Sequence, residues 1–285
     1  MGIYVVTGAA SGMGAAAAHK LRSAGHVVLG VDRADAGIVA DLSHARGRHD
    51  AAEEVLLASG GRLDGAVMAA GLGPALGPGR AKSIVQVNYL GVVDLLTAWR
   101  PALAGSGGAK VVVFSSNSTT TVPLVPARAV RALLAHDPDR ALRWIRVFGR
   151  RAPVMAYAAS KVAVSRWVRR QSVLPEWAGA GIRLNALAPG AVMTPLLQEQ
   201  LSSGEQAKLV QSFPVPTGGY GDAGQLADWA VFMLSDAADF LCGSVVFVDG
   251  GTDAFFRADD WPRPVPVSGL LRYLRRYRSG TWSRD

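Results

Sequence analysis

The segment Tyr157-Ala158-Ala159-Ser160-Lys161 carries the residue types best suited to proton transfer. It opens an apolar run with helical spacing, and residues four apart lie on the same face of a helix. We therefore expect the Lys161 ammonium near the Tyr157 phenol, where a fixed positive charge lowers a pKa of about 10. Such a pair would be an acid–base catalyst near neutral pH. Taken alone, a Tyr and a Lys at this spacing are more often an ordinary surface pair.

A second cluster, Thr7-Gly8-Ala9-Ala10-Ser11-Gly12-Met13-Gly14, follows an apolar run and leads into a helical pattern. Main-chain amides approach a pyrophosphate closely where side chains are absent, and a helix N-terminus favours an anion. The spacing is G-x-x-x-G-x-G rather than the more familiar G-x-G-x-x-G. A tight strand-to-helix turn is the alternative. The candidate phosphate-binding residues are Gly8, Ser11, Gly12, Met13 and Gly14.

Asp32 ends the next apolar run, 18 residues beyond Gly14. A carboxylate there accepts hydrogen bonds from an adenosine ribose and repels a 2′-phosphate, which favours NAD over NADP. The neighbouring Arg33 would instead attract that phosphate. Asp41 and Leu42 follow a further short run and are expected to flank the adenine, unless Asp41 caps the next helix.

The elements that must position these residues alternate along the chain. Near-continuous apolar runs are typical of strands buried on both faces of a parallel sheet, and helical segments near 12–24 and 44–58 lie between the first of them. This alternation predicts a doubly wound, Rossmann-like α/β domain over residues 1–256. The expected strands are 3–7, 27–31, 65–69, 110–115, 182–187 and 244–248.

Two segments depart from this alternation of strands and helices. Residues 117–156 contain their own helical signals, with Asp137 as an N-cap and Pro138 at the first helical position, and are predicted to form a helix-loop-helix insertion. Residues 257–285 form a basic C-terminal extension with a possible amphipathic helix near 270–277. We expect that helix to dock on a partner subunit; contact with an anionic membrane surface is the less favoured reading.

The composition excludes several classes of protein. The chain has 285 residues, of which 49% are hydrophobic, and one cysteine, so neither a disordered protein nor a disulfide scaffold is expected. The excess of positive charge, +8 in total, is concentrated in the insertion and the C-terminal extension. Residues 117–156 hold seven Arg and two Asp, and residues 261–285 hold six Arg and one Asp. Neither segment contains a recognisable motif for nucleic-acid recognition, so nucleic-acid binding is not expected.

The sequence also bears on location and on metals. It lacks a long uncharged apolar run and a signal-peptide pattern, which predicts a cytoplasmic protein. The five histidines are scattered without ligand spacing, so no metal site is expected.

The order T-G-x-x-x-G-x-G, a strand ending at Ser116, and Y-x-x-x-K resembles the short-chain dehydrogenase/reductase family. The resemblance implies that Ser116 steadies the reacting oxygen, with Ser115 as the less favoured candidate. It also implies that Tyr157 exchanges the proton while Lys161 lowers its pKa and holds the nicotinamide ribose. Asn88, in V-N-Y-L-G, matches the Asn that anchors a water for proton relay.

The resemblance implies further cofactor contacts. Pro189 and Gly190, with Val192 and Thr194, match the loop that holds the nicotinamide carboxamide. Ala70 and Gly71 lie in the family's N-N-A-G turn, in which Ala69 replaces an Asn. Asp249-Gly250-Gly251 matches the family's closing turn.

The interval of 41 residues between Ser116 and Tyr157 resembles that of the bacterial 3α-hydroxysteroid dehydrogenase/carbonyl reductases. This implies hydride transfer between NAD and hydrophobic secondary alcohols or ketones, by a homodimer or homotetramer. Two alternatives stay open: a dehydrogenase of aromatic or terpenoid alcohols, similar to coniferyl-alcohol dehydrogenases, and a non-catalytic dinucleotide sensor. Leu196, Leu197 and residues 213–216 are expected to fold over the substrate or to pack on the domain.

Overall fold

The computed structural model describes residues 1–202, 207, 210–261 and 264–278 and contains a seven-stranded parallel sheet of order β3-β2-β1-β4-β5-β6-β9. The expected strands are confirmed, with ends that differ by one or two residues. The doubly wound fold is therefore confirmed. The strands are β1 Ile3–Thr7, β2 Val27–Asp32, β3 Ile38–Val39, β4 Gly65–Met68, β5 Lys110–Phe114, β6 Arg183–Pro189 and β9 Val245–Val248.

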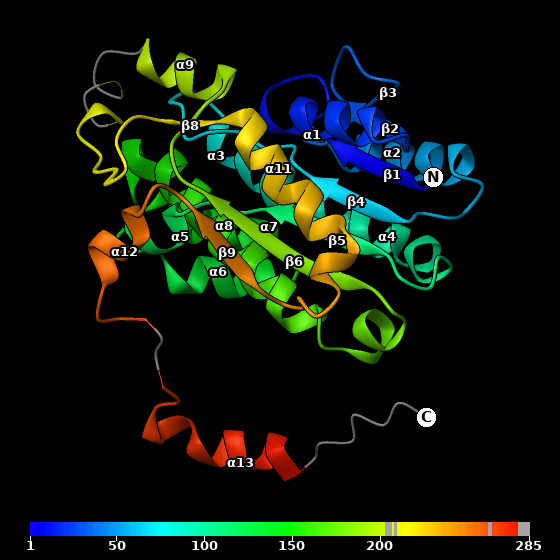
Figure 1. The fold of residues 1–285 in the computed structure, drawn as a ribbon. Coiled ribbons are helices and arrows are strands. Elements are labelled where there is room, and N and C mark those ends of the chain that lie inside the picture. Colours follow the sequence, from blue (N-terminus) through cyan, green and yellow to red (C-terminus); the bar gives the residue numbers. More distant parts are fainter. Residues whose placement is uncertain (203–206, 208–209, 262–263, 279–285) are drawn as a thin grey trace.

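Both faces of the sheet are covered by helices (Figure 1). Alternate residues of a strand point to opposite faces, so Val5 of β1 joins one core and Val6 joins the other. The Val6 side is covered by α1 Gly12–Ser23 and α11 Ala223–Leu234. The Val5 side is covered by α2 Ala45–Ala58, α4 Gly91–Ala104 and α8 Ala152–Gln171.

The strand order reverses between β1 and β4, which pair in parallel with Thr7 opposite Met68. Ligands of doubly wound sheets bind outside the carboxyl ends of the strands at such a switch point. The chain leaves β1 directly into the glycine cluster and leaves β4 into the segment Ala69-Ala70-Gly71. The fold therefore brings these two segments to one edge of the sheet.

The predicted insertion is helical and packs against the main core. It contains α5 Ser118–Thr121, α6 Ala127–Leu134, α7 Pro138–Arg146 and a 3₁₀ turn at Gly149–Arg151. The predicted cap is confirmed, since Asp137 Oδ1 accepts a hydrogen bond from the Arg140 amide at 2.9 Å. Leu133 and Ile145 are fully buried in the same cluster as the inner face of α8. Helix α8 begins at Ala152, inside the range 117–156.

Helix α12 Thr252–Arg257 ends where the predicted extension begins, and the extension contains a 3₁₀ turn at Val267–Gly269 and α13 Leu270–Arg278. The predicted helix is therefore present and lies apart from the sheet (Figure 1). Its apolar side chains Leu270 and Tyr277 are exposed, so the described residues do not cover them. Residues 262–263 and 279–285 of the predicted extension lie outside the described part.

Several shorter elements complete the described part of the chain. They are α3 Arg80–Val85, a π-helical turn at Gln86–Leu90, β7 Val192–Met193, α9 Pro195–Leu201 and β8 Gly221–Asp222, with further single turns at Pro175–Gly179 and Asp236–Ala238. Among the helices of the described residues, none has the length and apolar character needed to span a bilayer.

Candidate active site

The glycine cluster forms a cradle that side chains would fill. Gly8 has φ of +72°, and a Cβ there would lie 2.8 Å from the Ala70 amide nitrogen. A Cβ on Gly14 would lie closer still to the Gly8 carbonyl oxygen. Ser11, the N-cap of α1, makes no side-chain capping bond, so the amides of the first turn remain available to an anion. These features fit the pyrophosphate of a dinucleotide.

The cradle continues to the loop after β6. A Cβ on Gly12 would lie 3.4 Å from Thr194 Cγ2, so Thr194 borders the same space. Thr194 is buried and its hydroxyl donates to the Val192 carbonyl at 3.2 Å. Gly190 packs on the Asp249 backbone, where a Cβ would approach to 2.8 Å. Met13 lies partly buried at the start of α1 and packs against the core.

The Asp32 carboxylate lies beside the glycine cluster. Its Oδ2 accepts from the Ala10 amide at 3.0 Å and its Oδ1 from the Arg33 amide at 2.7 Å. The acid at the end of β2 is thus held against the loop after β1. An acceptor fixed at this point fits the hydroxyls of an adenosine ribose.

Asp41 does not cap the helix that follows. Its Oδ1 accepts from the Ser43 amide at 2.9 Å, and α2 begins at Ala45 with His44 as its N-cap. Burial alone would raise the pKa of the Asp41 carboxyl, but the hydrogen bonds from Ser43 and the charges of His44 and Arg33 outweigh it and lower that pKa. Leu42 is buried and packs near Gly91.

The turn after β4 is held without the Asn that Ala69 replaces. The Thr7 hydroxyl accepts from the Ala70 amide at 3.2 Å, and the Thr7 carbonyl accepts from the Ala69 amide at the same distance. Thr7, at the end of β1, therefore supplies a hydrogen bond to this turn, for which the sequence offered no Asn side chain. Gly71, at the end of this turn, lies beside Asn88 and Lys161, which a Cβ on Gly71 would approach to 3.6 and 3.9 Å.

Asn88 lies in the π-helical turn between α3 and α4. Its Oδ1 accepts from the Leu72 amide at 2.7 Å, and its Nδ2 donates to the Leu72 carbonyl at 3.0 Å. Turns of this kind occur often at functional sites. The side chain is thereby fixed to the loop after β4, next to Lys161.

The two serines after β5 point to different partners. The Ser116 hydroxyl accepts from the Ser118 amide at 3.1 Å and lies close enough to the Tyr157 phenol to lower its pKa. The Ser115 hydroxyl instead lies 2.6 Å from that of Ser165, in a fully buried contact with α8. The preference for Ser116 is therefore supported by geometry.

The pKa shifts of Tyr157 and Lys161 differ from the sequence prediction. Burial raises the pKa of the Tyr157 phenol, and the Ser116 hydrogen bond offsets only part of this. Burial also lowers the pKa of Lys161 to about 8. Its Nζ lies 5.9 Å from the Tyr157 ring centroid and donates to the Phe114 carbonyl at 2.6 Å. The predicted lowering of the Tyr157 pKa by Lys161 is therefore not found in this arrangement, in which burial raises that pKa.

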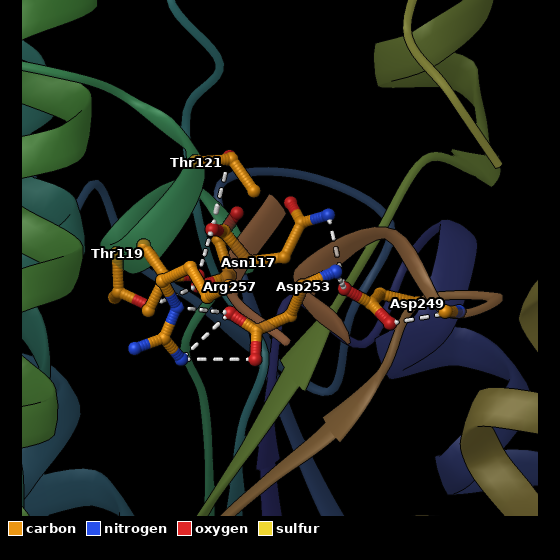
Figure 2. A network of polar contacts seen from close by, with 9 residues as sticks. Asn117, Thr119, Thr121, Asp249, Asp253 and Arg257 are labelled. Atoms are coloured by element: carbon orange, nitrogen blue, oxygen red, sulfur yellow. Dashed lines mark hydrogen bonds and ion pairs between the residues drawn. The ribbon is translucent and has the colours of Figure 1, made fainter. Parts of the chain in front are cut away.

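Sequence inspection missed the residue after Ser116. The Asn117 amide donates to the Pro189 carbonyl at 2.8 Å, and its Nδ2 lies 3.4 Å from Asp249 Oδ2 (Figure 2). The same carboxylate accepts from the Asp253 amide at 2.7 Å, and Asp253 pairs with Arg257 through two bonds of 2.8 and 2.9 Å. This chain of contacts links the segment of Ser116 to α12. An Asn directly after the strand-end serines was its only sequence signal.

The apolar segment after Thr194 packs against the closing turn at 249–252. The Thr252 hydroxyl donates to the Pro214 carbonyl at 2.8 Å, and a Cβ on Gly250 would lie 2.6 Å from Val215. Leu197 is buried. For these residues the packing alternative is supported; residues 203–206 and 208–209 of the same segment lie outside the described part. Among the described residues no cluster of potential metal ligands occurs.

A loop that fits a pyrophosphate, an acid placed for a ribose and a tyrosine between a serine and a lysine together define a nicotinamide-dependent dehydrogenase. Comparison with known proteins agrees. The family model described as short chain dehydrogenase matches residues 3–127, and the model described as enoyl-(acyl carrier protein) reductase matches residues 145–253. The interval between the two matches lies within the helical insertion.

Full-length relatives are found as well. The chain is 36% identical over 260 residues to the 3-alpha-hydroxysteroid dehydrogenase/carbonyl reductase of Comamonas testosteroni, covering 90% of this chain and 98% of that protein. It is 30% identical over 257 residues to a coniferyl-alcohol dehydrogenase of a Pseudomonas species, covering 87% and 94%. A crystal structure of the 3-alpha-hydroxysteroid dehydrogenase from Pseudomonas sp. B-0831 complexed with NADH has 40% identity and a TM-score of 0.85, over 91% of this chain and all of that one.

The chain belongs to the short-chain dehydrogenase/reductase family. It is an oxidoreductase that acts on CH–OH groups and interconverts alcohols and ketones with a nicotinamide dinucleotide.

Proposed function

We propose that this protein is an NAD-dependent dehydrogenase/reductase of bulky hydrophobic secondary alcohols and ketones of the hydroxysteroid type. The observation that carries the proposal is that the Ser116 hydroxyl lies near the Tyr157 phenol, with Lys161 buried one turn further along the same helix, α8. The relatives of similar length named for 3-alpha-hydroxysteroids support the substrate class.

The proposed roles follow from these contacts. Bound nicotinamide supplies hydride transfer to or from the carbinol carbon. Ser116 donates a hydrogen bond to the reacting oxygen while its charge changes. The raised pKa of Tyr157 keeps its phenol protonated at neutral pH, which suits proton donation to a ketone. In the oxidation of an alcohol the same side chain would accept the hydroxyl proton as phenolate.

Lys161 and Asn88 would complete the proton path. Lys161, with a pKa of about 8, holds or releases a proton in the physiological range. Asn88 lies next to it, fixed by two hydrogen bonds to Leu72. We assign to Asn88 the positioning of a water that carries the proton onward, and to Lys161 a contact with the nicotinamide ribose.

The remaining assignments concern the cofactor. Asp32, oriented by the Ala10 amide, supports NAD over NADP. Gly8, Ser11, Gly12, Met13 and Gly14 would hold the pyrophosphate. Adenine would lie near Asp41 and Leu42, and the nicotinamide end near a group of residues at the opposite end of the cradle: Ala70, Gly71, Pro189, Gly190, Val192 and Thr194.

Assembly and location complete the proposal. A homodimer or homotetramer is supported by the exposed apolar side chains of α11 and α13, including Trp229, Phe232 and Leu271. Small-angle scattering that returned the mass of one chain would contradict it. A cytoplasmic location is supported by the single cysteine, Cys242, which has no partner in the chain for a disulfide.

The test is a panel of 3-hydroxysteroids, aryl alcohols and monoterpene alcohols with NAD and with NADP. Turnover of steroids with NAD is expected, and Tyr157→Phe should abolish it while NADH still binds. Turnover of aryl or terpene alcohols alone would instead favour the activity of the coniferyl-alcohol dehydrogenase relative. Undiminished activity of Tyr157→Phe would refute the role of the phenol.

A further inference from the structure

A cavity of about 490 Å³ lies between α3, α7 and the start of α8, and none of the residues named above as cofactor contacts lines it. Four basic residues do: Arg80 and Lys82 of α3, Arg146 of α7 and Arg150 of the turn before α8. No acidic side chain lines it. The cavity is therefore a concentration of positive charge.

No carboxylate in the described part of the chain neutralises these charges. The Arg80 guanidinium donates to the Gly73 carbonyl at 3.1 Å, which leaves its charge unpaired. Among the described residues, Lys82, Arg146 and Arg150 have no carboxylate within ion-pair distance. Four like charges around one hollow repel each other, and an anion inside it would relieve that repulsion. The cavity is thus suited to an anionic group.

The rest of the lining is apolar. Leu142, Ala152 and Pro153 form a buried wall, and Leu76 contributes from the loop after β4. An apolar wall combined with a charged rim fits a molecule that is hydrophobic along its length and anionic at one end.

The cavity and the candidate active site share two elements. Pro153 lies four residues before Tyr157 on α8, which places the two on one helix face about one turn apart. Helical side chains lean toward the N-terminus, so the Tyr157 side chain leans toward the cavity end of α8. Gly73, which Arg80 contacts, follows Leu72, the partner of Asn88.

We propose that this cavity binds the carboxylate or sulfate terminus of an elongated hydrophobic substrate whose keto or hydroxyl group lies at Tyr157. The inference rests on the proposed function and narrows its substrate class to amphipathic anions. The inference also assigns a role in substrate binding to the insertion, since residues 117–156 supply Arg146 and Arg150.

The test compares two ketosteroids that differ only at the side-chain terminus, one with a free carboxylate and one with its methyl ester. The wild-type enzyme should favour the carboxylate through KM. Arg146→Ala and Arg150→Ala should each lower kcat/KM for the carboxylate about tenfold, as expected for one charge-assisted hydrogen bond, and leave the ester unchanged. Arg146→Lys should retain part of the preference.

Arg143→Ala is the matched control, because Arg143 lies on α7 but not in the cavity wall. It should behave as wild type with both ketones. Equal turnover of carboxylate and ester by the wild type, or equal losses on both in the variants, would overturn the inference. If neither ketone is turned over, the proposed function fails, and calorimetric binding of the same pair to the NADH-loaded protein still decides whether the cavity discriminates charge.

Discussion

Lys161 donates a hydrogen bond from its buried Nζ to the carbonyl oxygen of Phe114 at 2.6 Å. The contact ties α8 to the end of β5, directly before the two serines. Among the described residues no carboxylate lies within ion-pair distance of the ammonium, and desolvation lowers its pKa to about 8. The lysine is therefore held in place at a cost to stability.

The desolvation of Lys161 predicts that the free energy of unfolding depends on pH. In the unfolded chain Lys161 keeps its proton up to a pKa of about 10.4, and in the folded chain only up to about 8. Between these values the unfolded state binds more protons, so the free energy of unfolding should rise with pH. Lys161→Met should remove this slope and raise stability at pH 7 by up to about 3 kcal/mol, while abolishing turnover.

Chemical denaturation at several pH values between about 7 and 9.5 measures this slope. At higher pH the opposite effect enters, because burial raises the pKa of Tyr157, Tyr4 and Tyr89, and the unfolded chain loses those protons first. A Lys161→Met protein with the wild-type slope would contradict the argument.

Substitution of each of the two serines after β5 should distinguish a catalytic role from a packing role. Ser116→Ala removes the hydroxyl that contacts Tyr157, and we expect kcat to fall about 10²–10³-fold, as for loss of an oxyanion donor. Ser115→Ala removes the contact with Ser165 and should cost about 1 kcal/mol of stability with kcat preserved. Steady-state kinetics and thermal unfolding of both variants measure the difference; a larger kcat loss in Ser115→Ala would reverse the assignment.

Asp32 should set the cofactor preference. Asp32→Ala removes the carboxylate that would repel a 2′-phosphate, so the ratio of kcat/KM for NAD to that for NADP should fall by about tenfold or more. Arg33→Ala is the comparison on the adjacent residue. If Arg33 attracts the phosphate, its loss should shift the ratio in the opposite direction. An unchanged ratio in Asp32→Ala would remove the basis for preferring NAD.

Arg257 should affect the apolar segment at 213–216 indirectly, through Asp253 and the turn that contains Thr252. Arg257→Gln breaks its paired contact with Asp253, loosening the turn that Thr252 links to Pro214. We expect a loss of about 1–2 kcal/mol in stability and a rise in KM for the ketone that exceeds any change in kcat. Arg46→Gln, which breaks the exposed contact with Asp50 at 3.7 Å, should change neither. Equal effects of the two variants would exclude a role for the Asp253 contact.

Much of the fold was predictable because its signals are local. Runs such as 3–7 and 110–115 are apolar on both faces, as strands covered by helices on both sides must be. The cap at Asp137 and Pro138 fixed the start of α7 for the same reason. The glycine cluster and the Tyr157–Lys161 spacing depend on backbone shape and helix period, which are also properties of short segments.

The remainder depended on residues far apart in the chain. Which serine faces Tyr157 follows from the packing of Ser115 on α8, and the pKa of Tyr157 follows from how deeply the fold buries it. The link from Asn117 to Asp249 joins residues 132 positions apart, and the basic cavity gathers residues from two separate segments, 76–82 and 142–153. The sequence by itself thus determined the elements and the class of chemistry, through short-range pattern. Only the tertiary structure decided hydrogen-bond partners, burial and charge balance, because desolvation and long-range contacts exist only once the segments are packed together.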